Sequence, residues 1–217
     1  MLASGGGSNL QALLDHLGGR DASAAVALVG SDRPDAGALA RARKAGVPTV
    51  LIGNAGADAA ALLAALGAHG IQLVVLAGYL KLVPAAVVQA FHGRILNIHP
   101  ALLPSFGGPG MYGRRVHEAV LRSGARVSGA TVHLIDEQYD RGTIIAQWPV
   151  PVRDGDTPER LAARVLAAEH ALLVAVVRRA AVRLAAGRPV VPLDCAADQF
   201  AAADLPAPAV DDALVST

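Results

Sequence analysis

Short β-branched runs alternate with Ala- and Leu-rich segments of helical length along the first half of the chain. The predicted strands are 24–29, 47–52, 71–76 and 94–99, and the predicted helices between them are 36–45 and 57–69. The run from Ile71 to Leu76 is apolar without interruption, which is typical of a strand buried on both faces. This order predicts an α/β fold, a mostly parallel sheet with helices on both faces.

The pattern changes after Pro100. The segments that follow are a Pro- and Gly-rich loop over 101–112, a helix over 113–123 and two β-rich runs over 127–135 and 143–152. Because only a short polar turn separates the two runs, we expect an antiparallel pair that extends the sheet. Thr157 and Pro158 then mark the start of a long helix, as a capping residue and a first-turn proline.

Length and composition favour one folded unit. The chain has 217 residues, of which 53% are hydrophobic, so it can bury a sizeable core. Neither a repeat nor a linker divides it, and we predict a single domain over residues 1–194. Residues 195–217 are rich in Ala, Asp and Pro and predict a weakly ordered C-terminal tail.

Charge and cysteine content narrow the class of protein. The formal net charge is +1 without a basic block, which argues against nucleic-acid binding. Cys195 is the single cysteine, so an internal disulfide and a Cys-based metal site are excluded. The start of the chain lacks the features of a signal peptide, and the apolar runs are shorter than the ~20 residues that span a bilayer. We therefore expect a cytoplasmic protein that acts on small molecules.

A glycine-rich turn over residues 4–10, Ser-Gly-Gly-Gly-Ser-Asn-Leu, precedes the first helical pattern. Such a turn exposes backbone N–H groups at a helix N-terminus and favours an anion such as a phosphate. A dinucleotide-binding loop fits poorly because Leu10 replaces its third glycine, and we assign no ribose-binding role to Asp32. A tight turn without a ligand is the alternative.

Asn97 and His99 end the last predicted parallel strand. Residues two apart on a strand point the same way, and Pro100 ends the ladder, so both side chains lie at the carboxyl edge of the sheet, where open α/β folds bind ligands. An amide N–H and an imidazole could together stabilise an oxyanion. The alternative is that His99 is a structural hydrogen-bonding residue.

Two other carboxylate positions have weaker signals. The turn 136–142 contains Asp136, Glu137 and Asp140, and spacing does not choose which of them reaches His99. Glu169 lies at the margin of the apolar stripe of its helix, which predicts a solvated rim position, with a contact to a substrate amine as the alternative. The remaining histidines show no metal-like pairing, so we expect no catalytic metal.

Four motifs in order resemble those of the glycinamide ribonucleotide formyltransferases, a folate-dependent family of de novo purine synthesis. They are Ser-Gly-Gly-Gly-Ser-Asn-Leu from Ser4, Leu-Ala-Gly-Tyr-Leu-Lys-Leu from Leu76, Leu-Asn-Ile-His-Pro-Ala-Leu-Leu-Pro from Leu96, and Gly-Ala-Thr-Val-His-Leu-Ile-Asp-Glu-Gln-Tyr-Asp-Arg-Gly from Gly129. The resemblance runs from Ser4 to about Pro189. It implies the formyltransferase fold and transfer of the formyl group of 10-formyltetrahydrofolate to the amine of 5'-phosphoribosylglycinamide. Only three residues precede Ser4, where the family normally has a full first strand, so either the start codon is misassigned or the edge of the sheet is shortened.

The resemblance also implies roles for individual residues. Asn97, His99 and Asp140 match the catalytic trio of the family. Substrate phosphate and glycinamide binding is implied for Gly7, Ser8, Asn9 and Glu169. Folate binding is implied for Leu80, Lys81, Leu82, Val83, Asn97, Asp136, Glu137, Gln138, Tyr139 and Asp140. The co-substrate is 10-formyltetrahydrofolate, no metal is needed, and either a monomer or a homodimer is compatible.

Related formyl-transfer enzymes and two other classes are the alternatives. Enzymes that act on initiator methionyl-tRNA carry a further C-terminal domain, deformylases usually have a second His where Pro100 stands, and sugar-nucleotide formyltransferases lack the glycine-rich loop. A nucleotide-binding oxidoreductase is disfavoured by Leu10. A non-catalytic sensor of phosphorylated ligands is the remaining alternative.

Overall fold

The structure is a computed structural model of the chain, and it describes residues 1–18, 23–53, 58–135 and 140–193. The tail predicted over 195–217 lies outside these residues. Within the described residues, no helix is both long and apolar enough to cross a membrane.

The sheet combines parallel and antiparallel pairing. Its strands are β1 (Val29–Ser31), β2 (Thr49–Leu51), β3 (Val74–Ala77), β4 (Ile95–His99), β5 (Val127–Leu134) and β6 (Ile144–Pro151). The pairs β1/β2 and β3/β4 are parallel, whereas β4/β5 and β5/β6 are antiparallel. The predicted sheet and its antiparallel extension are confirmed, although β1 begins where the predicted strand 24–29 ends.

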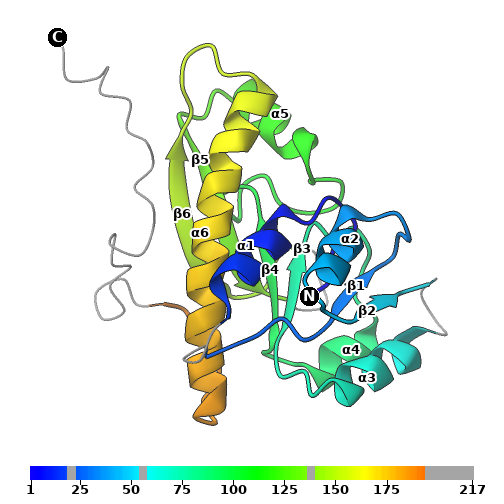
Figure 1. Cartoon of the computed structure of the whole chain (residues 1–217). Helices are drawn as coiled ribbons and strands as arrows, with labels where there is room; N and C mark the ends of the chain where they lie inside the picture. The colour runs from blue at the N-terminus through cyan, green and yellow to red at the C-terminus, as the bar shows by residue number, and fades with distance from the viewer. Residues whose placement is uncertain (19–22, 54–57, 136–139, 194–217) are drawn as a thin grey trace.

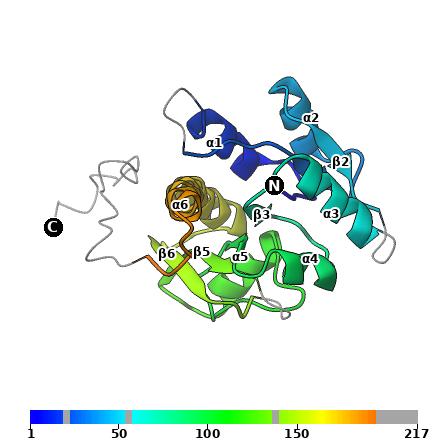
Figure 2. The same ribbon diagram turned by 90° about the horizontal axis from the view of Figure 1, so that it is seen from below.

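The first residues of the chain connect the two parts of the sheet. Leu2 bridges in parallel to Gly30 in β1 and to Leu76 in β3. The Leu2 N–H donates to Val75 O at 2.8 Å, and Ala3 N–H donates to Gly30 O at 3.0 Å. These residues lie in the middle of the sheet, where the N-terminus is marked in Figure 2, so the position expected at an edge was wrong. The shortening itself is seen, because Leu2 makes isolated bridges in place of a full strand.

Helices cover both faces of the sheet (Figures 1 and 2). They are α1 (Ser8–His16), α2 (Gly37–Lys44), α3 (Asp58–Ala68), α4 (Ala85–Ala90), α5 (Arg114–Arg122) and α6 (Pro158–Ala185). Successive side chains of β3 point to opposite faces of the sheet and so pack against different helices. Val75 packs in the cluster that contains α1 and α6, and Val74 packs in the cluster that contains α3 and α4.

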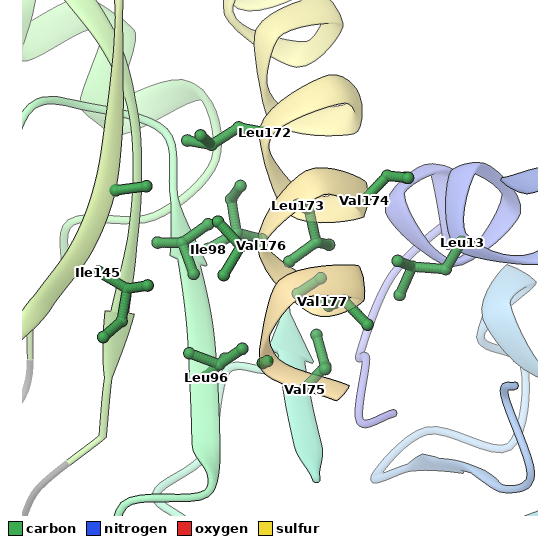
Figure 3. Packing of buried hydrophobic residues seen from close by; sticks show 14 of the residues in the cluster. Leu13, Val75, Leu96, Ile98, Ile145, Leu172, Leu173, Val174, Val176 and Val177 are labelled. Carbon is green, nitrogen blue, oxygen red and sulfur yellow. The ribbon is translucent and has the colours of Figure 1, made fainter. Parts of the chain in front are cut away.

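The long helix α6 forms the centre of the larger core. Leu172 and Leu173 are fully buried, and Figure 3 shows α6 between Leu96 and Ile98 of β4 on one side and Leu13 of α1 on the other. Removal of such side chains from water is the main stabilising term, roughly 2 kcal/mol for each fully buried leucine. This packing holds α1 against α6 and thereby places the glycine-rich turn close to the carboxyl ends of β3 and β4.

Candidate active site

One cavity of about 1250 Å³ lies at the carboxyl edge of the parallel strands. It is open to the glycine-rich turn, to the end of β4 and to α6. The predicted residues that line it are Gly7, Ser8, Asn9, Leu80, Lys81, Leu82, Val83, Asn97, His99, Asp140 and Glu169. The fold therefore brings the described members of the predicted phosphate, folate and catalytic sets around a single space.

The glycine-rich turn ends at Gly7, which has a left-handed backbone with φ 75°. A Cβ at Gly7 would lie 2.6 Å from the Cα of Ala38, so a side chain is excluded by both conformation and space. Helix α1 begins at Ser8, and its first bond from Gln11 N–H to Gly7 O leaves the N–H groups of the first turn without an intrahelical acceptor. These groups give the cavity a region that suits an anion.

His99 is held between a backbone carbonyl and a carboxylate. Its Nε2–H donates to the carbonyl of Phe106 at 2.9 Å, and its Nδ1 lies 3.7 Å from Oδ2 of Asp140. The side chain is 4% exposed, so water competes little for either contact. The structure thus pairs Asp140, which spacing alone did not choose, with His99.

The backbone beside His99 is strained on both sides. Phe106 has φ 59° and Asp140 has φ 53°, and they are the non-glycine residues with positive φ in the described parts of the chain. Such conformations persist only where the surrounding structure holds them, and they concentrate at functional sites. Here Gly108 N–H donates to Asp140 Oδ2 at 2.9 Å, and a Cβ at Gly107 would lie 3.1 Å from the Cβ of Asp140.

Asn97 is oriented by a histidine that the sequence interpretation did not include. His133 is directly opposite Asn97 in the antiparallel β4/β5 register. The Nδ1–H of His133 donates to Leu134 O at 2.9 Å, so its Nε2 accepts from Asn97 Nδ2 at 3.0 Å. This bond leaves the second amide N–H of Asn97 available to the cavity.

Burial decides the charge of His99. Loss of solvent lowers the pKa of His99, and the nearby Asp140 and the bond to Phe106 offset this only in part. Burial by itself would raise the pKa of Asp140, but the hydrogen bond from the Gly108 N–H and the nearby His99 hold it below its usual value. Nε2 of His133 lies 3.5 Å from Asp140 Oδ1, but it accepts from Asn97 and so does not donate to the carboxylate. The pair is therefore a carboxylate beside a neutral imidazole near neutral pH.

Glu169 does not lie at a solvated rim. Its side chain is 7% exposed, and its Oε2 accepts from Asn9 Nδ2 at 2.9 Å. Helix α1 packs over this part of α6 and covers Glu169. The position of Glu169 relative to the apolar stripe of α6 does not show that a second helix packs there, so the sequence pattern predicted exposure instead of burial. Burial raises the pKa of Glu169 to about 7, with the bond from Asn9 acting in the opposite direction.

The raised pKa of Glu169 predicts a stability difference with pH. A carboxyl that binds its proton more tightly in the folded state stabilises that state at low pH, and this contribution is lost as pH rises toward 7. We expect Glu169→Gln to gain roughly 2 kcal/mol in free energy of unfolding relative to the unmodified chain between about pH 5 and about pH 8, as measured by urea denaturation. Glu118→Gln, at a partly exposed glutamate, is the control, and an equal gain there would contradict the interpretation.

The predicted folate wall lines the cavity as an apolar rim. Leu80 and Leu82 are 40% and 60% exposed, so this rim has apolar surface available to a ligand. Lys81 Nζ lies 3.8 Å from Asp32 Oδ2, which gives Asp32 an ion pair. The other predicted folate contacts, Asp136, Glu137, Gln138 and Tyr139, lie outside the described residues.

A second histidine of the cavity was also not anticipated. His117 of α5 is 5% exposed, lines the cavity, and has no hydrogen-bond partner for its Nδ1. Burial lowers its pKa, and the nearby His99 lowers it further. The sequence pattern of α5 does not predict that His117 lines the cavity, because it does not show which element packs against the helix.

Among the described residues, no group of three His, Cys, Asp or Glu side chains could hold a metal ion.

Comparisons with known proteins agree on one family. The model of the formyl transferase family matches residues 1–177. A phosphoribosylglycinamide formyltransferase of Mycobacterium tuberculosis (strain ATCC 25618 / H37Rv) is 46% identical over 182 residues, which cover 82% of this chain and 81% of that protein. A chloroplastic phosphoribosylglycinamide formyltransferase of Arabidopsis thaliana is 47% identical over 183 residues.

The chain spans only part of the length of its plant relatives, whereas it matches a solved bacterial structure along most of both chains. The chain spans 63% of the Arabidopsis protein and 58% of the corresponding Vigna unguiculata protein. The crystal structure of phosphoribosylglycinamide formyltransferase from Brucella melitensis is 43% identical, with a TM-score of 0.76, and the match covers 83% of this chain and 93% of that one.

Proposed function

The chain belongs to the formyl transferase family, and from this premise we propose that it transfers the formyl group of 10-formyltetrahydrofolate to the amine of 5'-phosphoribosylglycinamide. The products are formylglycinamide ribonucleotide and tetrahydrofolate, in de novo purine biosynthesis. The names of the relatives support this choice of acceptor, since those matched along most of their length are phosphoribosylglycinamide formyltransferases.

The observation that carries the proposal is the single cavity that joins the glycine-rich turn to His99 and Asp140. Sites for one small molecule usually measure about 300–1000 Å³, so a cavity of about 1250 Å³ has room for two substrates side by side. The turn supplies N–H groups for a phosphate, and the Leu80 and Leu82 rim supplies apolar surface for a folate ring. The reacting groups would then meet at Asn97 and His99, which line the same cavity.

In the proposed mechanism, the substrate amine attacks the formyl carbon directly, and no covalent enzyme intermediate forms. The free N–H of Asn97 donates to the oxyanion that develops on the formyl oxygen. His99 is neutral beforehand, and the negative charge that develops next to it raises its pKa, as does the carboxylate of Asp140. Donors that are already oriented toward the developing charge lower the barrier most.

Asp140 and His99 are proposed to carry the proton that the amine must lose. The attacking nitrogen releases this proton, through a water molecule, to Nδ1 of His99 beside Asp140. The positive charge of the protonated imidazole then stabilises the oxyanion. When the tetrahedral adduct collapses, the carbon–nitrogen bond to the folate breaks and the proton passes to that nitrogen. The proton count balances without a metal or an external acid.

A direct assay tests the proposal. The purified chain is incubated with 10-formyltetrahydrofolate and 5'-phosphoribosylglycinamide, and mass spectrometry follows the formylated ribonucleotide while tetrahydrofolate is quantified. We expect the two products in equal amounts. Formate release without formyl transfer would instead indicate a deformylase, and absence of turnover together with tight binding of the ribonucleotide would indicate a sensor.

A further inference from the structure

The glycine-rich turn is held from behind by an arginine of the neighbouring helix. Arg41 of α2 donates from Nε to the carbonyl of Gly6 at 2.9 Å and from Nη1 to Gln11 Oε1 at 3.0 Å. Arg41 is exposed and does not line the cavity, whereas Gly6 does. The guanidinium therefore contacts the turn on the side that faces away from the cavity.

The contact between Arg41 and the Gly6 carbonyl fixes the direction of the N–H of Gly7. In a planar trans peptide the C=O and N–H bonds point in opposite directions. Since the Gly6 carbonyl points to Arg41, the N–H of Gly7 points away from Arg41, and Gly7 itself lines the cavity. Ala38 N–H donates to Gly5 O at 3.1 Å, so the N–H of Gly6 is turned in the same sense. Two successive N–H groups aimed together form an anion-binding concavity.

A second observation places a ligand at this turn. Asn9, in the first turn of α1, is 9% exposed and lines the cavity. Its Nδ2 is used by Glu169, but its buried Oδ1 has no partner. A buried acceptor without a donor is costly, so a polar group of a bound molecule is expected there.

We propose that Arg41 is a positioning residue for the phosphate group of the substrate: by fixing the Gly6 carbonyl from outside the cavity, it aims the Gly7 N–H at that phosphate. This inference rests on the proposed function. Arg41 touches no reacting atom, so its loss acts on the affinity for the phosphorylated substrate and leaves the chemical step unchanged.

The experiment compares Arg41→Met with Arg43→Met, which removes the same charge from an exposed position of the same helix. For Arg41→Met we expect KM for 5'-phosphoribosylglycinamide to rise by about tenfold, the effect of losing one charge-assisted hydrogen bond, with kcat and KM for the formyl donor unchanged. Arg43→Met should behave like the unmodified enzyme. Arg41→Lys, which keeps a donor, should raise KM less than Arg41→Met does.

The dephosphorylated acceptor provides the decisive comparison. With ribosylglycinamide as the acceptor, kcat/KM should be the same for the unmodified enzyme and Arg41→Met, because no phosphate is present to be positioned. An equal loss with both acceptors, an unchanged KM in Arg41→Met, or the same loss in Arg43→Met would overturn the inference. If the unmodified enzyme formylates neither acceptor, the proposed function itself fails.

Discussion

Replacing Asn97 by alanine is expected to lower kcat by about a hundredfold to a thousandfold, while the protein stays folded. The amide is the donor that is already oriented toward the cavity, through the bond from Asn97 Nδ2 to His133 Nε2. Its loss removes stabilisation that exists mainly in the transition state, so kcat falls and KM for either substrate changes little.

The control for Asn97→Ala removes a carboxamide elsewhere. Gln89 is exposed on α4 and does not line the cavity, so Gln89→Ala should keep full activity. Steady-state kinetics gives kcat and KM, and circular dichroism during heating checks that both variants fold. Activity of Asn97→Ala close to that of the unmodified enzyme would remove the amide from the mechanism.

Asp140→Asn is expected to lower kcat by at least about a hundredfold. The substitution keeps the size of the side chain, an acceptor for Gly108 N–H and a residue type that tolerates positive φ. It removes the negative charge that raises the pKa of His99, the group that receives the amine proton. Because the pKa of Asp140 is held below its usual value, the loss should be constant between about pH 6 and about pH 8.

Asp154→Asn is the matched control for that experiment. Asp154 is 89% exposed and pairs with Arg126, and neither residue lines the cavity, so its neutralisation should leave kcat unchanged. The measurement is kcat as a function of pH for the three proteins. A loss in Asp140→Asn that disappears at either end of this range would show that the carboxylate acts by titrating, contrary to the mechanism.

The sequence pattern predicted the positions that depend on strand periodicity. Asn97 and His99 share one face of β4, and the proline after them ends the strand, so their common location followed from alternation alone. Asp140 could not be chosen from its turn by spacing, and only the resemblance to a family pointed to it. The structure places its carboxylate beside His99 at 3.7 Å.

Other parts of the site depend on contacts that a single chain pattern does not contain. His133 meets Asn97 through the register of two antiparallel strands, which sequence alternation does not determine. The Phe106 contact is made by a backbone carbonyl, so its side chain gives no signal. Glu169 is buried by a helix from the other end of the chain, and the N-terminal residues pair with strands that follow much later.

The loop after β4 is tied to the sheet by one hydroxyl whose hydrogen-bonding capacity is fully used. Thr131 Oγ1 donates to Ala101 O at 2.6 Å and accepts from Leu103 N–H and from Gln147 Nε2. These bonds join protein groups only, so they form when the chain folds. The Phe106 carbonyl that orients His99 therefore belongs to a preorganised framework, and the entropy of ordering it is lost once at folding and not again at each turnover.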